Sequence, residues 1–226
     1  MPQPVPEIIY AFDPLCGWCY GFSPVVARLR STFGHHATWR LMSGGLVTGD
    51  RMQPIREMKD YLQHGMAAVT ARTGQQFGEG FLRLLDEGSW ISRSEPACRA
   101  MFVVQREWPA AAMDFAQALC AAFYQTGLKL DAPDTLAIVA ESCGLDAKAL
   151  LELWSGKTAQ RETAAEFANA SRLGITGYPA LHLSTGAGIK CLVNGCASFE
   201  QAYASLRNHI PHPIDAGTSL PEEFAQ

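Results

Sequence analysis

Residues 7–22 read EIIYAFDPLCGWCYGF, and this stretch decides how the rest of the chain is interpreted. Its first part, residues 7–12, is a short apolar run of the kind that forms a buried strand. The Asp-Pro step at residues 13–14 ends that run, because the residue before a proline is disfavoured in the helical region. Cys16 and Cys19 follow, three positions apart, and helically spaced apolar residues come after them. The stretch therefore predicts a strand, a turn that carries two thiols, and a helix.

The elements that follow extend this pattern. Gly34 ends the first helix, and residues 37–43 (ATWRLMS) are typical of a second strand, so the first part of the chain is a βαβ unit with parallel strands. Residues 48–156 then carry helical patterns with almost no strand signal. After a further helix over residues 158–173, strands at 180–183 and 189–193 form a hairpin, and Ser198 and Gln201 have the spacing of a capping box that starts a last helix.

This order of elements indicates the fold class. It is an α/β order, β-α-β followed by α-β-β-α, and without the helical block it is the order of the thioredoxin fold. We expect residues 1–47 and 157–226 to form one discontinuous thioredoxin-like domain. Residues 48–156 carry too many apolar faces for a loop, so we expect an all-helical insertion subdomain packed over the sheet.

The spacing of Cys16 and Cys19 indicates redox chemistry. Two cysteines three apart at a helix start can close a disulfide, and the helix N-terminus stabilises the thiolate of the first one. We expect Cys16 to be the attacking sulfur and Cys19 the resolving sulfur. The alternatives are a pair of structural thiols and a zinc site. Zinc requires about four ligands, and the sequence has no second CxxC and no suitably spaced histidine pair, so we expect no metal.

Pro179 is the second candidate element of the site. A proline before the second strand region of such a sheet is a candidate for a cis peptide bond, which tertiary structure can impose at an X–Pro step. The Tyr178 backbone would then face Cys16 and could pair with an extended substrate segment. The simpler interpretation is that Pro179 only opens an edge strand. We expect Gly17, Trp18, Tyr178 and Pro179 to contact the substrate.

The other cysteines are expected to be less reactive. The chain has seven cysteines, an odd number, in 226 residues, which is not typical of a small disulfide-stapled scaffold. Cys98, Cys120 and Cys143 lie on apolar helix faces and are predicted to pack in the core. Cys191 and Cys196 bracket an Asn-Gly turn and are an open case, because an extended strand would hold them too far apart for a disulfide.

Composition excludes several classes of protein. There are 18 Lys and Arg against 22 Asp and Glu, a formal net charge of −4, which argues against nucleic-acid binding. We see no apolar stretch long enough to cross a membrane and no signal-peptide pattern, so we expect no membrane association and a cytoplasmic location. In that reducing compartment the thiol pair would rest as a dithiol.

Three segments together resemble the DsbA-like family. They are DPLCGWCYGF at residues 13–22, GITGYPA at 174–180 and VNG at 193–195, and the similarity covers essentially the whole chain. It is greatest to the predicted protein-disulfide isomerase branch of that family, which is often cytosolic. The resemblance implies that Cys16 and Cys19 are the redox pair, that Pro179 is the cis-proline, and that protein or peptide thiols and disulfides are the partners.

The sequence also departs from the periplasmic oxidants of that family. The dipeptide between the cysteines is Gly17-Trp18 instead of Pro-His, and Tyr10 occupies the strand position where a buried acid is expected. From the resemblance we expect a protein-disulfide oxidoreductase or isomerase that requires no organic cofactor, with glutathione as a candidate co-substrate.

The alternative is a glutathione-dependent enzyme of the kappa-type transferase or 2-hydroxychromene-2-carboxylate isomerase class. Those enzymes use a serine at the first position, where this chain has Cys16. A third candidate is a non-catalytic module that binds peptides around Trp18 and Pro179.

Overall fold

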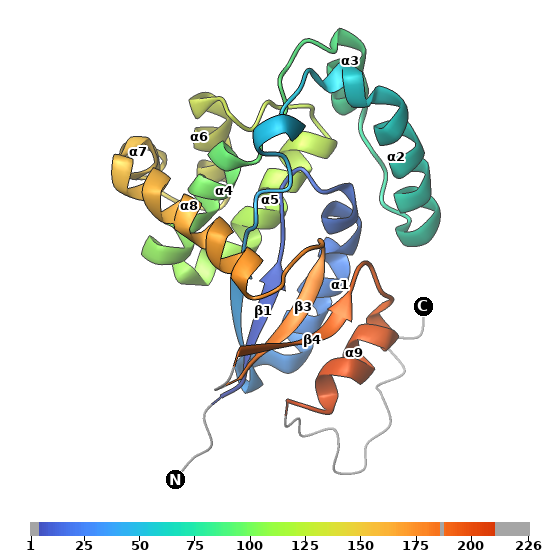
Figure 1. The fold of residues 1–226 in the computed structure, drawn as a ribbon, viewed down its shortest axis with the longest axis vertical. Helices are drawn as coiled ribbons and strands as arrows, with labels where there is room; N and C mark the ends of the chain where they lie inside the picture. Colours follow the sequence, from blue (N-terminus) through green and yellow to red (C-terminus); the bar gives the residue numbers. More distant parts are fainter. Residues whose placement is uncertain (1–4, 186–187, 211–226) are drawn as a thin grey trace.

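The computed structural model describes residues 5–185 and 188–210 and has a four-stranded sheet flanked by helices (Figure 1). The strands are β1 (Glu7–Ala11), β2 (Thr38–Met42), β3 (Ala180–Thr185) and β4 (Gly188–Asn194). The α-helices are α1 (Gly17–Phe33), α2 (Lys59–Thr73), α3 (Glu79–Glu87), α4 (Glu95–Glu107), α5 (Ala112–Tyr124), α6 (Pro133–Ser142), α7 (Ala147–Ser155), α8 (Lys157–Arg172) and α9 (Phe199–Arg207). The chain from Pro211 onward, which the sequence suggests is a polar tail, lies outside the described residues.

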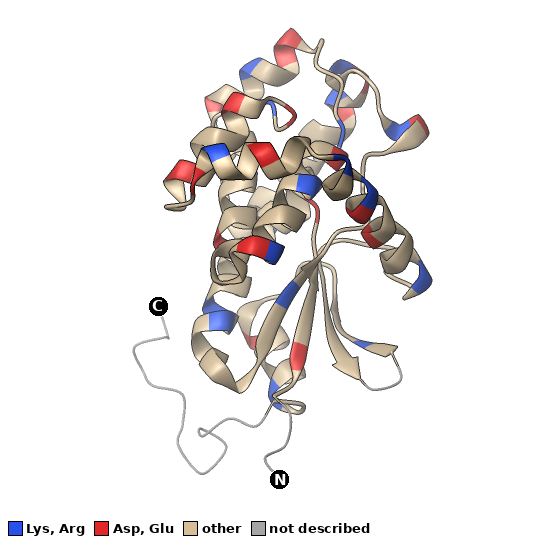
Figure 2. Ribbon diagram, turned by 90° about the vertical axis from the view of Figure 1, so that its left-hand side faces the viewer, with Lys and Arg blue, Asp and Glu red and all other residues tan. Residues whose placement is uncertain are grey.

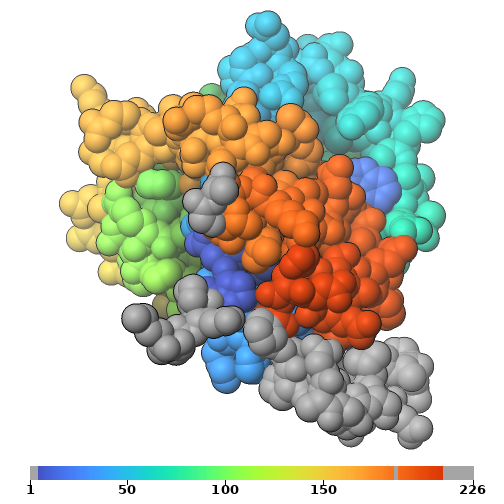
Figure 3. Space-filling model, turned by 60° about the horizontal axis from the view of Figure 1, so that its bottom comes forward, coloured from blue at the N-terminus to red at the C-terminus, as the bar shows by residue number. Residues whose placement is uncertain are grey.

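The sheet combines strands from the N-terminal part of the chain with strands from its C-terminal part. Its order is β2-β1-β3-β4, with β1 parallel to β2 and antiparallel to β3, and β3 antiparallel to β4. Figure 3 shows the C-terminal segments, in orange and red, lying directly against the N-terminal segments in blue. The thioredoxin-like order of elements and the helical insertion that the sequence predicts are therefore both present.

Alternation along β1 divides the core into two layers. Ile8, Tyr10 and Phe12 point to the face that α1 and α9 cover, whereas Ile9 and Ala11 point to the opposite face. Ala170, near the C-terminal end of α8, packs on that second face. Successive side chains of a strand point to opposite faces, so one apolar run supplies both layers, and β1 is buried on both sides at the centre of the sheet.

The helical insertion packs at the end of the sheet from which α1 starts. Helix α5 contacts both α1 and β2, and α4 packs on α5, α7 and α8. Helix α2 packs on α1, and α3, at the top of the view in Figure 1, contacts α5. Acidic and basic residues alternate along the helices without a large patch of one sign among the described residues (Figure 2). The boundaries at residues 48 and 156 stay predictions.

Within residues 5–185 and 188–210, no helix is long and apolar enough to span a membrane.

Candidate active site

Cys16 caps the first turn of α1. It has an extended backbone conformation (φ −91°, ψ 109°), and the backbone N–H of Cys19 donates to the Cys16 Sγ at 3.3 Å. The helix begins here because the Asp-Pro step prevents an earlier start, and because a sulfur at this position can accept an orphan N–H of the first turn. The same N–H and the helix dipole stabilise negative charge on that sulfur. The structure thus places Cys16 at the helix N-terminus, as the sequence predicts.

The two thiols differ in access. Cys16 retains 6% exposure, whereas Cys19 is completely buried one turn along the helix. Burial and the neighbouring Cys16 raise the pKa of Cys19 well above its usual value. Cys19 therefore holds its proton at neutral pH, and Cys16 is the more accessible of the two residues.

The Tyr178–Pro179 step lies beside Cys16, although 162 positions separate the two residues in sequence. The peptide bond is cis, the isomer favoured by the sequence, and the Cys16 Sγ donates to the Tyr178 carbonyl oxygen at 3.5 Å. The Pro179 carbonyl accepts from the Gly195 N–H at 2.9 Å, which ties this step to the turn after β4. Backbone from the C-terminal half of the chain is thereby brought to the thiol.

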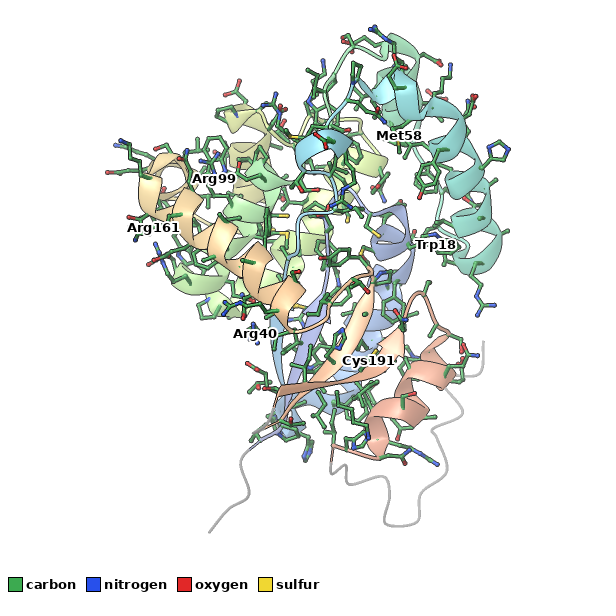
Figure 4. The ribbon with its side chains drawn as sticks, in the orientation of Figure 1. Trp18, Arg40, Met58, Arg99, Arg161 and Cys191 are labelled. Atoms are coloured by element: carbon green, nitrogen blue, oxygen red, sulfur yellow. The ribbon has the colours of Figure 1, made fainter. Side chains whose placement is uncertain are left out.

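Of the remaining predicted contacts, Trp18 is the most exposed. It retains 37% exposure in the first turn of α1 and lies on the side of the molecule that carries α2 (Figure 4). Gly17 is half-buried beside Tyr124 and Val69, since a Cβ at residue 17 would lie 3.8 Å from the Tyr124 hydroxyl and 4.0 Å from a Val69 methyl. The structure therefore brings the predicted residues together around Cys16.

Asp13 has a larger structural role than its sequence position suggests. An Asp-Pro step is typical of a turn, and the Leu15 N–H does donate to the Asp13 carboxylate at 2.9 Å. The carboxylate is also fully buried and accepts from the Leu46 N–H at 2.8 Å and from the Ser94 hydroxyl at 2.9 Å. Burial raises the pKa of Asp13, whereas these hydrogen bonds lower it, with burial the larger effect. Asp13 thus links the active-site turn to the segment after β2 and to α4.

Sequence reasoning missed two further residues of the site. The Tyr124 hydroxyl, from α5, donates to the Leu15 carbonyl at 2.6 Å and fixes the backbone next to Cys16. Ser94 marks the start of α4 as the sequence predicts, but its hydroxyl bonds Asp13 instead of capping the helix. Both residues lie in the helical insertion, and nothing local to their sequence indicates a partner some 80 to 110 positions away.

The Tyr10 hydroxyl faces the same core as the thiols. It is buried and has no hydrogen-bond partner among the described residues. Burial raises the Tyr10 pKa further, so the phenol stays neutral. The strand position where an acid is expected therefore holds the Tyr10 phenol. A buried carboxylate is present nearby, at Asp13, two residues after β1.

The other cysteines are free thiols. Cys98 and Cys120 are buried in the core as predicted, and Cys143 is half-buried at its edge. Cys191 is exposed on β4, and Cys196 is half-buried after the turn. Mass spectrometry of non-reduced peptides tests whether Cys191 and Cys196 form a second disulfide.

Among the residues that the structure describes, no group of three or more His, Cys, Asp or Glu side chains could hold a metal ion.

Gly44 provides a test of the Tyr178 position that leaves both sulfurs unchanged. A Cβ at residue 44 would collide with the end of the Tyr178 ring, so Gly44→Ala must displace that ring. We expect at least about a fivefold loss of disulfide-exchange rate, because misplacing a group beside the reacting atoms slows reaction steeply. Gly65→Ala, at an open position inside α2, is the control and should keep the wild-type rate with a slightly raised melting temperature. Equal rates for both variants would show that the position of the Tyr178 ring does not matter for exchange.

The fold and the site define a thioredoxin-like protein with a paired-cysteine turn at the start of its first helix. Residues 7–206 match the family model described as DSBA-like thioredoxin domain, and the chain belongs to this family. No match was found among curated protein sequences.

Solved structures give the same assignment. The chain is similar to a "putative protein disulfide isomerase" from Nitrosomonas europaea, with 29% identity and a TM-score of 0.81, over 91% of this chain and 97% of that one. It is similar to the cytosolic disulfide reductase DsbM from Pseudomonas aeruginosa, with 26% identity and a TM-score of 0.70, over 82% of this chain and 88% of the other. A 2-hydroxychromene-2-carboxylate isomerase, 17% identical with a TM-score of 0.61 over 94% and 100% of the two chains, shares the fold. Family and relatives together support thiol–disulfide oxidoreductase chemistry in general.

Proposed function

We propose that this protein exchanges disulfides with protein or peptide thiols through a mixed disulfide at Cys16 that Cys19 resolves. The observation that carries the proposal is the placement of Cys16 at the N-terminus of α1, beside the Tyr178 carbonyl and one turn ahead of a buried second thiol. The DSBA-like family membership supports the same chemistry.

The proposed reaction has two thiol–disulfide exchange steps. The Cys16 thiolate attacks one sulfur of a substrate disulfide, a Cys16–substrate S–S bond forms, and the other substrate sulfur leaves and takes up a proton. Cys19 then loses its proton and attacks Cys16, so that the second substrate thiol is released and the pair is left as a disulfide. Counted from the dithiol, the protein has lost two electrons and two protons, one of these protons when Cys16 ionises, and the substrate has gained them.

Substrate binding uses the surface around these sulfurs. An extended substrate segment can pair with the Tyr178 backbone, as in strand addition. Trp18 offers an exposed apolar surface on one side of Cys16, and Gly17 leaves the approach open. Pro179 keeps Tyr178 in place through its own bond to Gly195.

Trapping the intermediate tests this proposal. In a Cys19→Ser variant the second step cannot occur, so incubation with a disulfide-bonded peptide should accumulate one peptide per chain at Cys16. Peptide mass spectrometry locates the adduct. Cys191→Ser is the control, because it removes an exposed thiol on β4 but keeps Cys19, so it should not accumulate the adduct. The proposal fails if no adduct forms, or if adducts distribute over the other cysteines.

For the direction of electron flow we propose reduction or isomerisation in the cytoplasm. Trp18 carries no charge, so the thiolate lacks the imidazole that favours the reduced form in strong oxidants. We expect the Cys16–Cys19 couple to have a potential nearer to about −270 mV than to about −120 mV. Equilibration with glutathione redox buffers measures it, and a value near the upper figure would identify an oxidant. A second structure of DsbM, matched at 25% identity, is of that protein with GSH, which supports glutathione as a recycling reductant here.

A glutathione-dependent transferase or isomerase is the second candidate. The shared fold with the 2-hydroxychromene-2-carboxylate isomerase favours it, whereas a cysteine at residue 16 in place of the serine of that class does not. Saturable glutathione binding with conjugating activity retained in Cys19→Ala would reverse the ranking, because disulfide exchange requires the second thiol and conjugation does not.

A further inference from the structure

A cavity of about 410 Å³ opens next to the active-site turn, between the segment after β2 and the first turns of α2. Its walls are mainly apolar and include Leu15, Val47, Ile55, Leu62 and Phe123. The volume lies within the range of about 300–1,000 Å³ that ligand pockets usually have, which is enough for a large apolar side chain. The helical insertion supplies all of these walls except Leu15 and Val47.

The cavity begins one residue from the nucleophile. Leu15, which lines it, directly precedes Cys16 and is held by two hydrogen bonds, from its N–H to Asp13 and from the Tyr124 hydroxyl to its carbonyl. Phe123, the residue before Tyr124, lines the cavity as well. The cavity and the reactive sulfur therefore share the same hydrogen-bonded turn and the same helix, α5.

The rim on the side of Tyr178 carries a positive charge. Arg51 lines the cavity, and its guanidinium bonds the Gly45 carbonyl at 3.3 Å. Within residues 5–185 and 188–210, no carboxylate forms an ion pair with Arg51. The Gly45 carbonyl that it bonds directly follows Gly44, which lies against the end of the Tyr178 ring, so the guanidinium lies on the Tyr178 side of the cavity. Asp50 lines the cavity as well.

Exposed aromatic residues extend the apolar surface. Tyr61, in the first turn of α2, lines the cavity and is 71% exposed. Trp18 and Met58 lie on the same side of the molecule, toward α2 (Figure 4). Exposed aromatic side chains at the edge of an apolar pocket are typical of surfaces that bind a polypeptide.

We infer that this cavity is a specificity subsite for a polypeptide substrate, which takes a large apolar side chain close in sequence to the reacting cysteine and favours an acidic residue beyond it, near Arg51. The inference rests on the proposed function, because it assumes that a substrate sulfur reacts at Cys16. An extended peptide paired with Tyr178 sends its neighbouring side chains to the two sides of Cys16, and the cavity lies on one of them. The insertion would thus select substrates, while the thioredoxin-like part performs the exchange.

The test uses short peptides whose single cysteine is linked to 5-thio-2-nitrobenzoate. Reduced protein converts each into the peptide thiol and the yellow thionitrobenzoate, while Cys16 and Cys19 become a disulfide. Peptides with Phe adjacent to the cysteine, or two positions from it, should react about tenfold faster than the matching Ser peptides, a ratio typical of apolar pockets. An added Glu should give a further gain over an added Lys.

Two variants assign these preferences to the cavity. Leu62→Trp fills it and should abolish the preference for Phe, whereas Gln63→Trp, on the exposed side of α2, should retain it. Arg51→Gln, at an exposed position, should abolish the preference for Glu and leave the preference for Phe. Melting curves of the three variants check that each of them is folded.

The outcomes separate the inference from the proposed function. Equal rates with Phe and Ser peptides, or a Phe preference that survives Leu62→Trp, would overturn the subsite while disulfide exchange stands. A preference for Glu that survives Arg51→Gln would overturn the role of Arg51. If a small aromatic disulfide shows the Leu62-dependent advantage and the peptides do not, the cavity binds small molecules and the inference is wrong. If no peptide reacts, the proposed function itself fails.

Discussion

Replacing Cys16 by serine should lower the rate of insulin disulfide reduction by at least about a thousandfold. A hydroxyl in place of the thiol remains protonated at neutral pH and forms no disulfide, so the first chemical step is lost and not merely slowed. The fold should be retained, since serine has the shape of cysteine and its oxygen can accept the Cys19 N–H as the sulfur does. Insulin turbidity with dithiothreitol or glutathione as the reductant measures the effect.

The matched control for this variant is Cys196→Ser. Cys196 is a half-buried free thiol in the turn that Gly195 ties to Pro179, so it lies in the same region without capping α1. We expect Cys196→Ser to keep at least about half of the wild-type rate. Wild-type turnover by Cys16→Ser, or complete inactivation by Cys196→Ser, would mean that the wrong sulfur has been assigned as the nucleophile.

Replacing Asp13 by alanine should reduce the free energy of unfolding by about 3–4 kcal/mol. The substitution leaves the Leu15 and Leu46 N–H groups and the Ser94 hydroxyl without their acceptor. A buried donor without a partner costs about 1–3 kcal/mol, and removal of the buried carboxylate offsets part of the total. Because these donors belong to three separate segments, the loss should also loosen the turn that carries Cys16 and lower the exchange rate.

Two further variants test the origin of that loss. Asp13→Asn keeps an oxygen acceptor but turns an amide toward one of the donors, so its effect should be smaller than that of alanine. Asp114→Ala removes an exposed carboxylate paired with Arg30 and should cost no more than about 1 kcal/mol. Urea denaturation of the four proteins gives the comparison. A loss for Asp13→Ala no greater than for Asp114→Ala would show that the hydrogen bonds to Asp13 contribute little to stability.

The strands and the first helix could be predicted from the sequence because their signals are local. The apolar run before Asp13, the Asp-Pro step and the glycine at residue 34 fix β1 and α1 within a residue or two. The Ser198–Gln201 capping box is present as predicted, and Asp146 caps α7. In each case the interacting groups are three or four positions apart, so their spacing carries the information.

The partners of the site could not be predicted in the same way. Asp13 suggests only a turn by its sequence, yet its carboxylate bonds groups of the segment after β2 and of α4. The Tyr124 hydroxyl reaches the backbone beside Cys16 from α5, and Arg51 reaches the edge of a cavity that no local pattern reveals. These contacts depend on how helices of the insertion pack, and side-chain periodicity indicates that a helix face is buried without indicating what it meets.

By itself, the sequence determined the order of the elements, the two thiols at the start of a helix and the proline near them, because short-range sterics and spacing govern all three. Only the tertiary structure decided that Tyr178 lies against Cys16, that Cys19 is sealed while Cys16 is not, and that the insertion forms a cavity beside them. The physical reason is that burial and contact between distant segments are properties of the packed chain. The same packing sets the environment of each sulfur and therefore its chemistry.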